Sequence, residues 1–285
     1  MLKRLGVALT AAVLMSVGAG AAHASNPALP GLTNLDFTSY TGIAPKGRFT
    51  DVKPTGWTGG SGLIYIDSLA HPGTENLGLN GLPTKGNPSG SVPGNYVEAD
   101  GNPVFESGFN YEVHGLTAGQ TYSLSFYQGA SSQTGFPSAP GCNCTTNQWI
   151  VSLGTLGLNV STSGGPNDPI FGPTGTYSNS DPNASIAASQ LMTVPDGGVV
   201  GWQFVSVNLT ADAPDQLLSF LAWGDNGSTI NLPPIAFLAG VNSPPGLGSG
   251  TPEPATWAMM LMGFAGVGGM VRAARRAHRP AAVKA

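Results

Sequence analysis

The stretch Thr121–Tyr127, TYSLSFY, alternates between apolar and polar side chains. Aromatic residues and leucine occupy its even positions, and hydroxyl-bearing residues occupy its first three odd positions. Because successive side chains of a β-strand point to opposite faces of the sheet, this alternation predicts a strand with one buried and one exposed face. A tight turn, GLTAGQ (Gly115–Gln120), leads into it.

Further strand-like runs lie between Gly, Pro and polar turn residues along the chain. The expected strands are Gly62–Asp67, Asn95–Ala99, Phe109–His114, Gln120–Gln128, Gln148–Leu153, Gln190–Val194, Gly201–Leu209, Gln216–Ala222 and Ile235–Val241. No long segment between them has a 3.6-residue apolar period, so the predicted fold class is all-β, a jelly-roll β-sandwich. The loops 69–93 and 157–188 are expected to lack regular structure.

Composition favours an extracellular β-domain. The chain has 285 residues, with 42 Gly, 24 Pro and only 9% charged residues, against about 25% in ordinary globular proteins. Only four Lys and Arg residues lie between Ser25 and Gly250, whereas every acidic residue except Glu253 lies there. An acidic domain cannot neutralise a phosphate backbone, so nucleic-acid binding is excluded as a function class. Divalent cations and neutral polysaccharides are the expected partners.

The N-terminus reads as a secretory signal peptide over residues 1–24. A basic start precedes the apolar run Leu5–Val17, and small residues follow up to Ala24. A run this short, ending in an A-x-A-like sequence, fits cleavage between Ala24 and Ser25 better than a spanning helix. The expected ectodomain covers residues 25–241, and a Pro/Gly/Ser-rich linker follows over residues 242–251.

The C-terminal segment 252–285 contains one apolar run, Thr256–Val271, followed by clustered arginines. A spanning helix uses about 20 apolar residues, so this expected transmembrane helix is of marginal length. Arginines on its far side would keep that end in the cytoplasm and leave the domain outside.

This tail resembles the PEP-CTERM sorting signal in its PEP-x-x-W-A variant. The residues that carry the resemblance are Pro252, Glu253, Pro254, Trp257, Ala258, Arg272, Arg275 and Arg276. The resemblance implies an exosortase as partner, cleavage near the motif, and transient residence in the inner membrane before release to the cell surface or extracellular matrix. Such systems accompany exopolysaccharide production and biofilm.

The central segment is similar to exported proteins that carry a galactose-binding-domain-like jelly roll. The similar stretches are Asn34–Asp67, Asn102–Phe136, Gln148–Thr155, Gly201–Gly224 and Pro233–Val241. The resemblance implies sugar binding through loops at one end and a structural calcium ion near the termini. Ala239 stands where the resemblance implies an acidic residue in the last strand. Calcium takes six to eight oxygen ligands, and Asp36, Asp67 and Asp100 are the candidate ligands.

Two cysteines, Cys142 and Cys144, are separated by one residue. In an exported chain a local disulfide is the favoured interpretation, and a metal or redox site is the alternative. The expected ectodomain has two histidines, His71 and His114, and no nucleophile-elbow or zinc-binding motif. No cofactor is expected apart from the candidate calcium.

The tryptophans divide into two groups. Trp149 and Trp202 lie within apolar strands and are expected in the core. Trp57 and Trp223 lie beside polar turns, and Trp223 is followed by Asp225 and Asn226. An exposed aromatic ring beside hydrogen-bonding side chains forms a platform for a carbohydrate, so these four residues, with the two rings expected at the surface, are the candidate ligand-binding set.

The sequence therefore favours a non-enzymatic exported protein that associates with exopolysaccharide. A secreted polysaccharide hydrolase is an alternative, because two carboxylates suffice for glycoside hydrolysis. A purely structural matrix protein is the other alternative.

Overall fold

The structure is a computed structural model that describes residues 26–42, 47–68, 79–82, 95–102, 108–134, 146–163, 174–224 and 234–242. Several sequence expectations fall outside these residues. They are the signal peptide with its Ala24/Ser25 cleavage site, the cysteines Cys142 and Cys144, the loop residues Asp225 and Asn226, and the sorting signal from Pro252 onward. Within the described ranges, no helix combines the length and hydrophobicity that a membrane crossing requires.

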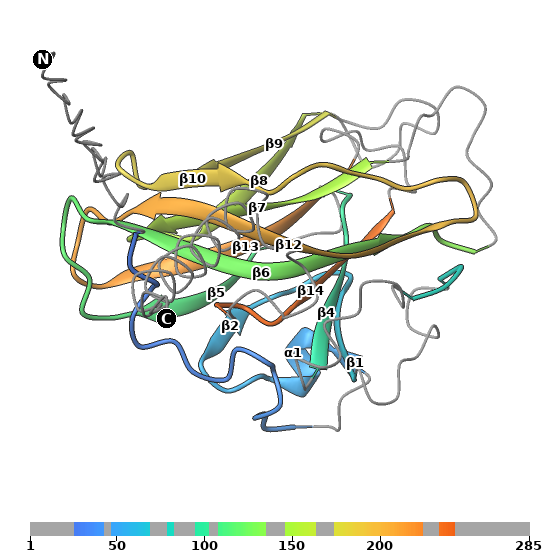
Figure 1. The fold of residues 1–285 in the computed structure, drawn as a ribbon, viewed down its shortest axis with the longest axis horizontal. Coiled ribbons are helices and arrows are strands. Elements are labelled where there is room, and N and C mark those ends of the chain that lie inside the picture. Colours follow the sequence, from blue (N-terminus) through green and yellow to red (C-terminus); the bar gives the residue numbers. More distant parts are fainter. Residues whose placement is uncertain are drawn as a thin grey trace, which may run out of the picture.

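Two β-sheets form the body of the protein (Figure 1). The first sheet has the order β1-β3-β4-β14-β6-β12, with β1 Gly47–Arg48, β3 Ile64–Ser68, β4 Asn95–Asp100, β14 Ile235–Ala239, β6 Thr121–Ser131 and β12 Val199–Thr210. The second has the order β10-β7-β13-β5-β2, with β10 Ser185–Ala188, β7 Thr146–Gly154, β13 Gln216–Gly224, β5 Phe109–Val113 and β2 Trp57–Gly59. A short strand, β11 Met192–Thr193, also pairs with β7, and one helical turn, α1 Phe49–Val52, follows β1.

The main core lies between the two sheets. Apolar side chains at alternate positions of each strand point into it: Ile64 and Ile66 from β3 share one cluster with Leu124 from β6 and Phe220 from β13. The alternation of apolar and polar residues predicted this arrangement. All nine expected strands are present, although their ends differ by up to a few residues. The all-β sandwich is therefore confirmed.

The strands from β4 onward pass repeatedly between the sheets. β4, β6, β12 and β14 belong to the first sheet, whereas β5, β7 and β13 belong to the second. Each of these strands is paired antiparallel with its neighbours. Connections that cross the core in this way place residues distant in sequence beside each other, as in β5 and β13.

The segment 157–188 is not the structureless loop that the sequence predicted. It contains β8 Leu158–Ser163 and β9 Thr174–Asn179, which pair as a two-stranded antiparallel sheet, and it ends in β10. This hairpin lies against the outer face of the second sheet, where Leu158 joins a buried cluster with Ile150, Leu221 and Trp223. The sequence did not predict these two strands because LNVSTS and TGTYSN contain few apolar residues.

The first sheet is also covered on its outer face. A second apolar cluster there includes Tyr96, Tyr127, Trp202 and Phe237, together with Leu79 from the short described segment 79–82. As a result every residue of β4 and β14 is buried, on both faces of the sheet.

The two ends of the described chain meet on β6. Ala28 forms a parallel bridge with Ser123, and the Asn242 side-chain amide donates to the Leu29 carbonyl at 3.2 Å. Leu29, which follows the expected cleavage site in sequence, and Asn242, where the expected linker starts, therefore lie side by side.

Candidate functional site

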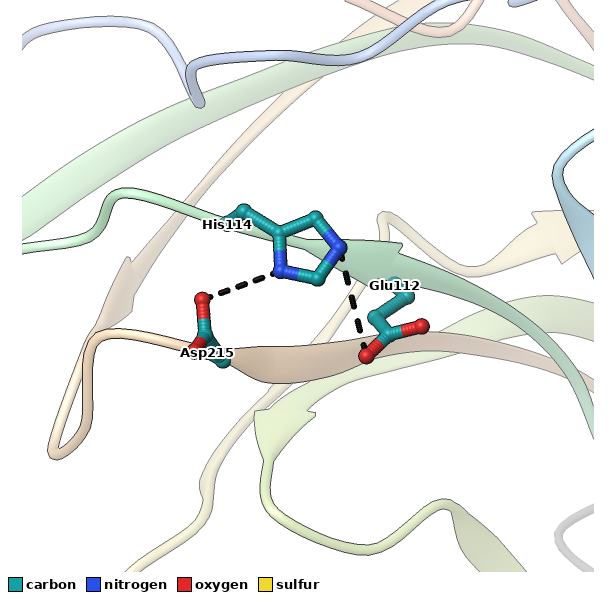
Figure 2. Close-up of polar contacts among 3 residues, drawn as sticks. All are labelled: Glu112, His114 and Asp215. Carbon is teal, nitrogen blue, oxygen red and sulfur yellow. Dashed lines mark hydrogen bonds and ion pairs between the residues drawn. The ribbon is translucent and has the colours of Figure 1, made fainter.

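His114 is the one histidine of the described residues for which polar contacts are seen (Figure 2). It lies just after β5, and its Nδ1 is 2.9 Å from Asp215 Oδ1 in the loop before β13. Its Nε2 is 3.9 Å from Glu112 Oε1. The His114 side chain is 63% exposed, and both carboxylates are 66% exposed. Catalytic triads use a buried carboxylate to orient the imidazole, so this group is a solvated surface contact instead.

A second group of polar residues is buried on the outer face of the first sheet. Glu98 lies on β4 and is fully buried, and the Tyr96 hydroxyl donates to its Oε1 at 3.1 Å. Asp67 of β3 is directly opposite Tyr96 in the sheet and is also fully buried. Glu98 Oε2 has no hydrogen-bond partner in the described structure.

Burial is the largest influence on the pKa values of Glu98 and Tyr96. It raises the pKa of Glu98 to about 8, and the negative charge of Asp67 adds to this, while the Tyr96 hydrogen bond opposes it. Burial likewise raises the pKa of the Tyr96 phenol. At neutral pH Glu98 is therefore mainly a neutral acid, which is the cheaper state for a carboxyl group in apolar surroundings.

Asp100 stands at the end of the same strand. Its Oδ1 accepts a hydrogen bond from the Asn102 backbone N–H at 2.9 Å. Burial raises the pKa of Asp100 to about 6, against the opposing hydrogen bonds from Asn102 and the Gln133 side chain.

The three candidate calcium ligands do not meet. Asp36 Oδ1 accepts from the Thr38 hydroxyl at 2.9 Å, in the N-terminal segment. Asp67 is paired with Tyr96, and Asp100 lies four residues further along β4, roughly 13 Å away at the rise of a strand. Among the described residues no group of three or more His, Cys, Asp or Glu side chains could hold a metal ion. Asp36, Asp67 and Asp100 therefore do not form a shared site in the described part of the chain.

The candidate aromatic platforms are buried. Trp57 is 5% exposed and packs against Phe37 and Tyr111, with its Nε1 donating to the Asn34 carbonyl at 3.2 Å. Trp223 is 3% exposed because the β8–β9 hairpin covers it, and Tyr177 meets it edge to face at 5.0 Å. The expectation that these two rings are exposed is therefore wrong.

The other two tryptophans behave as the sequence predicted. Trp149 is fully buried between the sheets, and Trp202 lies in the outer apolar cluster of the first sheet.

An exposed polar surface covers one half of β6 and β12. We call it the hydroxyl face and define it by Asn26, Thr121, Ser123, Ser125, Ser206, Asn208 and Thr210, all of which are exposed or partly exposed. Three contacts link its side chains: Thr121 to Thr210 at 2.9 Å, Ser123 to Ser206 at 3.1 Å, and Asn26 to Asn208 at 3.1 Å. Neither strand contains an Asp, Glu, Lys, Arg or His residue.

Sequence reasoning identified the β6 strand but not this surface. The available signal was the identity of the outward positions: hydroxyl or amide side chains occupy every second residue of Thr121–Ser125 and of Ser206–Thr210. What the sequence could not supply was the register that places Thr121 opposite Thr210.

No family model and no curated protein matches the chain. Among solved structures, the enzymatically active domain of tailspike protein 4 of bacteriophage CBA120 is similar over 72% of this chain and 21% of its own, with 11% identity and a TM-score of 0.29. The chain therefore spans about a fifth of that protein. The K2 cleaved adhesin domain of Lys-gingipain is similar over 72% of this chain and 96% of its own, with 14% identity and a TM-score of 0.20. Both scores are too low to identify a shared fold or function.

Proposed function

We propose that the protein is a non-catalytic exported protein whose β-sandwich associates with neutral exopolysaccharide at the cell surface or in the extracellular matrix. The observation that carries the proposal is the hydroxyl face, an exposed side of two paired strands without a charged residue. The finer assignment, a galactose-binding-like jelly roll, rests on the sequence resemblance and agrees with strands that pass repeatedly between the two sheets.

The chemistry of this face suits sugar hydroxyls. Ser and Thr hydroxyls both donate and accept hydrogen bonds, as sugar hydroxyls do, and Asn208 adds an amide with two donors and one acceptor oxygen. Alternate residues of one strand are about 7 Å apart and neighbouring strands about 4.8 Å apart, so the side chains form a regular grid. Such contacts are individually weak and partly water-mediated, which is appropriate for a protein held in a matrix by many copies.

Export and sorting are proposed from the sequence. The signal peptide directs the chain out of the cytoplasm, and an exosortase recognises the Pro252–Pro254 motif while the apolar run holds the chain in the inner membrane. Processing then leaves the sandwich outside, where the proposed ligand is found.

The proposal of a non-catalytic role rests on the positions of the carboxyl groups. A glycosidase needs two carboxyl groups flanking an open site, about 5–10 Å apart. Glu98 and Asp67 are closed off from a polysaccharide by complete burial. Glu112 and Asp215 are exposed, and His114 lies between them (Figure 2). The first pair is therefore inaccessible to a polysaccharide, and the imidazole of His114 occupies the space between the members of the second.

A glycan array with the purified processed protein, with and without calcium, tests the proposal. We expect binding to neutral glycans that does not depend on calcium. The double substitution Ser206→Ala/Asn208→Ala should weaken it about tenfold, because it removes two or more hydrogen bonds. Glu112→Gln, on the other sheet, is the matched control and should leave it unchanged. A protein that binds no glycan, or a double variant that binds as well as the wild type, contradicts the proposal.

A further inference from the structure

The strand β12 forms one edge of the first sheet. It holds 12 residues, whereas the other three edge strands of the two main sheets, β1, β10 and β2, hold two, four and three. Short edge strands, charged residues and prolines are the usual means by which proteins prevent a sheet edge from pairing with another chain. β12 lacks all three, because VVGWQFVSVNLT contains no charged residue and no proline. Its register shift lies between Val200 and Gln203, so Phe204–Thr210 is a regular strand up to its end.

The pairing with β6 determines which backbone groups of β12 point away from the sheet. Opposite residues of an antiparallel ladder alternate between pairs that exchange backbone hydrogen bonds and pairs whose N–H and C=O groups point away from each other. Asn208 lies opposite Ser123, but the Ser123 N–H donates to the Pro27 carbonyl at 2.8 Å, on the other side of β6. The backbone groups of Asn208 therefore point out from the edge. By the same alternation the free-edge residues of the regular segment are Phe204, Ser206, Asn208 and Thr210.

This free edge is open. Ser206, Asn208 and Thr210 are exposed, and no backbone hydrogen bond joins the free edge to another part of the chain that the structure describes. Its N–H and C=O groups are therefore left to water or to the backbone of another chain.

Large apolar side chains are exposed on the same side of the sandwich. Ile186 of β10, which lies beside β12, is 43% exposed, and Leu191 is 50% exposed. The side-chain amide of Gln128 donates both to the Gln190 carbonyl at 2.8 Å and to Gln203 Oε1 at 3.3 Å, which places the residue before Leu191 next to β12. The free edge is thus accompanied by apolar area that a second protein surface can cover.

We propose that the free edge of β12 pairs antiparallel with the free edge of β12 in a second copy of this chain, so that the first sheets of the two copies join into one. Such a pairing is self-complementary about a twofold axis, as the interfaces of most homodimers are. The register that engages every free-edge residue pairs Ser206 with Asn208 of the second copy and Phe204 with Thr210 of the second copy, with the axis at Val207. Each of these pairs exchanges backbone hydrogen bonds.

Charge favours a second copy in this orientation. Acidic residues outnumber Lys and Arg between Ser25 and Gly250, so two copies repel each other over most of their surface and meet at least cost where neither is charged. Asp212 is the first charged residue after β12. The antiparallel pairing puts the Asp212 side chains of the two copies at opposite ends of the ladder, whereas a parallel pairing would put them side by side.

The side chains at the join are also compatible. Ser206 and Asn208 can both donate and accept hydrogen bonds, and in this register each lies directly opposite the other, at the spacing at which cross-strand side chains interact. A single strand pair buries little area, so the dimer should be weak and should depend on concentration. If the proposed function is correct, the pairing joins two hydroxyl faces into one surface and raises the avidity for a long glycan. That consequence rests on the proposed function, whereas the pairing itself does not.

Sedimentation velocity of the full-length protein over a range of concentrations tests the pairing, together with amide hydrogen exchange at the lowest and the highest concentration. We expect the monomer to give way to a dimer as the concentration rises. Where about nine-tenths of the chains are paired, the Ser206 and Asn208 amides should exchange about tenfold more slowly than in the monomer, because only the unpaired chains exchange. The Val207 and Leu209 amides, which face β6, should be protected at both concentrations.

Variants locate the contact. Ser206→Lys/Asn208→Lys places like charges opposite each other across the join and should weaken the dimer about tenfold or more. The matched control Thr176→Lys/Ser178→Lys adds the same charge at alternate exposed positions of β9 and should dimerise as the wild type does.

A third variant covers the case in which the two lysines unfold the strand. Asn208→Pro removes an N–H that β6 does not use, and an edge strand tolerates proline where the N–H faces solvent. It should abolish the dimer and keep the circular dichroism spectrum of the wild type.

A wild type that stays monomeric at every concentration overturns the proposal. So does a dimer that persists unchanged in both the lysine double variant and Asn208→Pro, since the contact would then lie elsewhere in the chain. A dimer in which the Ser206 and Asn208 amides gain no protection overturns it as well. None of these measurements involves a glycan, so a failure of the proposed function would leave their results unchanged.

Discussion

The indole of Trp149 connects the two sheets directly: its Nε1 donates a hydrogen bond to the carbonyl of Phe237 at 3.0 Å. Trp149 belongs to β7 of the second sheet and Phe237 to β14 of the first, and both side chains are fully buried. The indole also meets Phe109 edge to face, with the ring centroids 6.0 Å apart. One side chain thus contributes both apolar packing and a polar contact across the core.

Replacing Trp149 with Phe should lower the free energy of unfolding by about 2–4 kcal/mol, since it leaves a cavity and removes a donor from a buried carbonyl. Denaturant unfolding followed by circular dichroism measures the loss. Trp202→Phe is the matched control, because that ring lies in the outer cluster, and it should cost less. Equal losses in the two variants would show that the hydrogen bond to Phe237 contributes nothing.

The contact between Tyr177 and Trp223 gives a second prediction. Tyr177 of β9 packs on Trp223, beside Leu158 and Val160 of β8, where the hairpin lies against the second sheet. Tyr177→Ala should loosen this hairpin while leaving the sandwich folded, at a cost of about 1–2 kcal/mol from lost burial and ring contact. Faster hydrogen exchange confined to β8 and β9 would report it. Thr176→Ala, at an exposed position of the same strand, should change little, and loosening of both variants alike would count against the role of Tyr177.

Alternation was sufficient to predict the strands that line the main core. The first half of β6 shows it clearly, because burial on one face requires only that every second residue be apolar. β13 was identified instead from a nearly continuous apolar run, which matches its burial on both faces. Even the irregular segment Gly201–Leu209 was identified, although β12 has a register shift between Val200 and Gln203 that no local pattern indicates.

Local alternation did not predict which segments cover the outer faces of the two sheets. Trp223 looked exposed because polar residues follow it in sequence, but the β8–β9 hairpin, which comes earlier in the chain, buries it. Glu98 was expected in a strand, yet nothing local showed that its side chain would be fully buried. The separation of Asp67 from Asp100 likewise depends on the register of β3 against β4, which no local pattern indicates.

Sorting gives a third prediction, from the sequence alone. Replacing Pro252–Pro254 with three alanines should leave the protein at full length and in the membrane fraction, because the exosortase no longer recognises it. Intact mass and cell fractionation measure this, and Ser249→Ala in the linker is the control that should be processed normally. An alanine variant with the size and location of the wild type would mean that the motif is not a sorting signal.

Asp181 gives a fourth prediction. Its surroundings lower its pKa, whereas those of Glu98 raise the pKa of that residue. Its Oδ2 accepts from the Thr155 backbone N–H at 2.7 Å and from the Thr155 hydroxyl at 2.8 Å, and its Oδ1 accepts from the Asn183 N–H at 2.9 Å. These donors favour the ionised form, so they lower the pKa of Asp181 below its ordinary 3.8. The stability that they give is present above that ordinary value and is lost as the pH falls through the lower pKa of the folded state.

Asp181→Asn keeps the shape of the side chain but offers one acceptor oxygen in place of two, so at least one of the three donors loses its partner. The variant should therefore melt at a lower temperature than the wild type at pH 7. The difference should be smaller at pH 3, which lies below the ordinary pKa of an aspartate, because the stabilisation by these donors has then begun to be lost. Thermal unfolding at both pH values measures this. Asp212→Asn, in the loop before β13, is the matched control for the removal of a negative charge. A difference for Asp181→Asn that is the same at pH 7 and pH 3 would show that its ionised form does not stabilise the turn between β9 and β10.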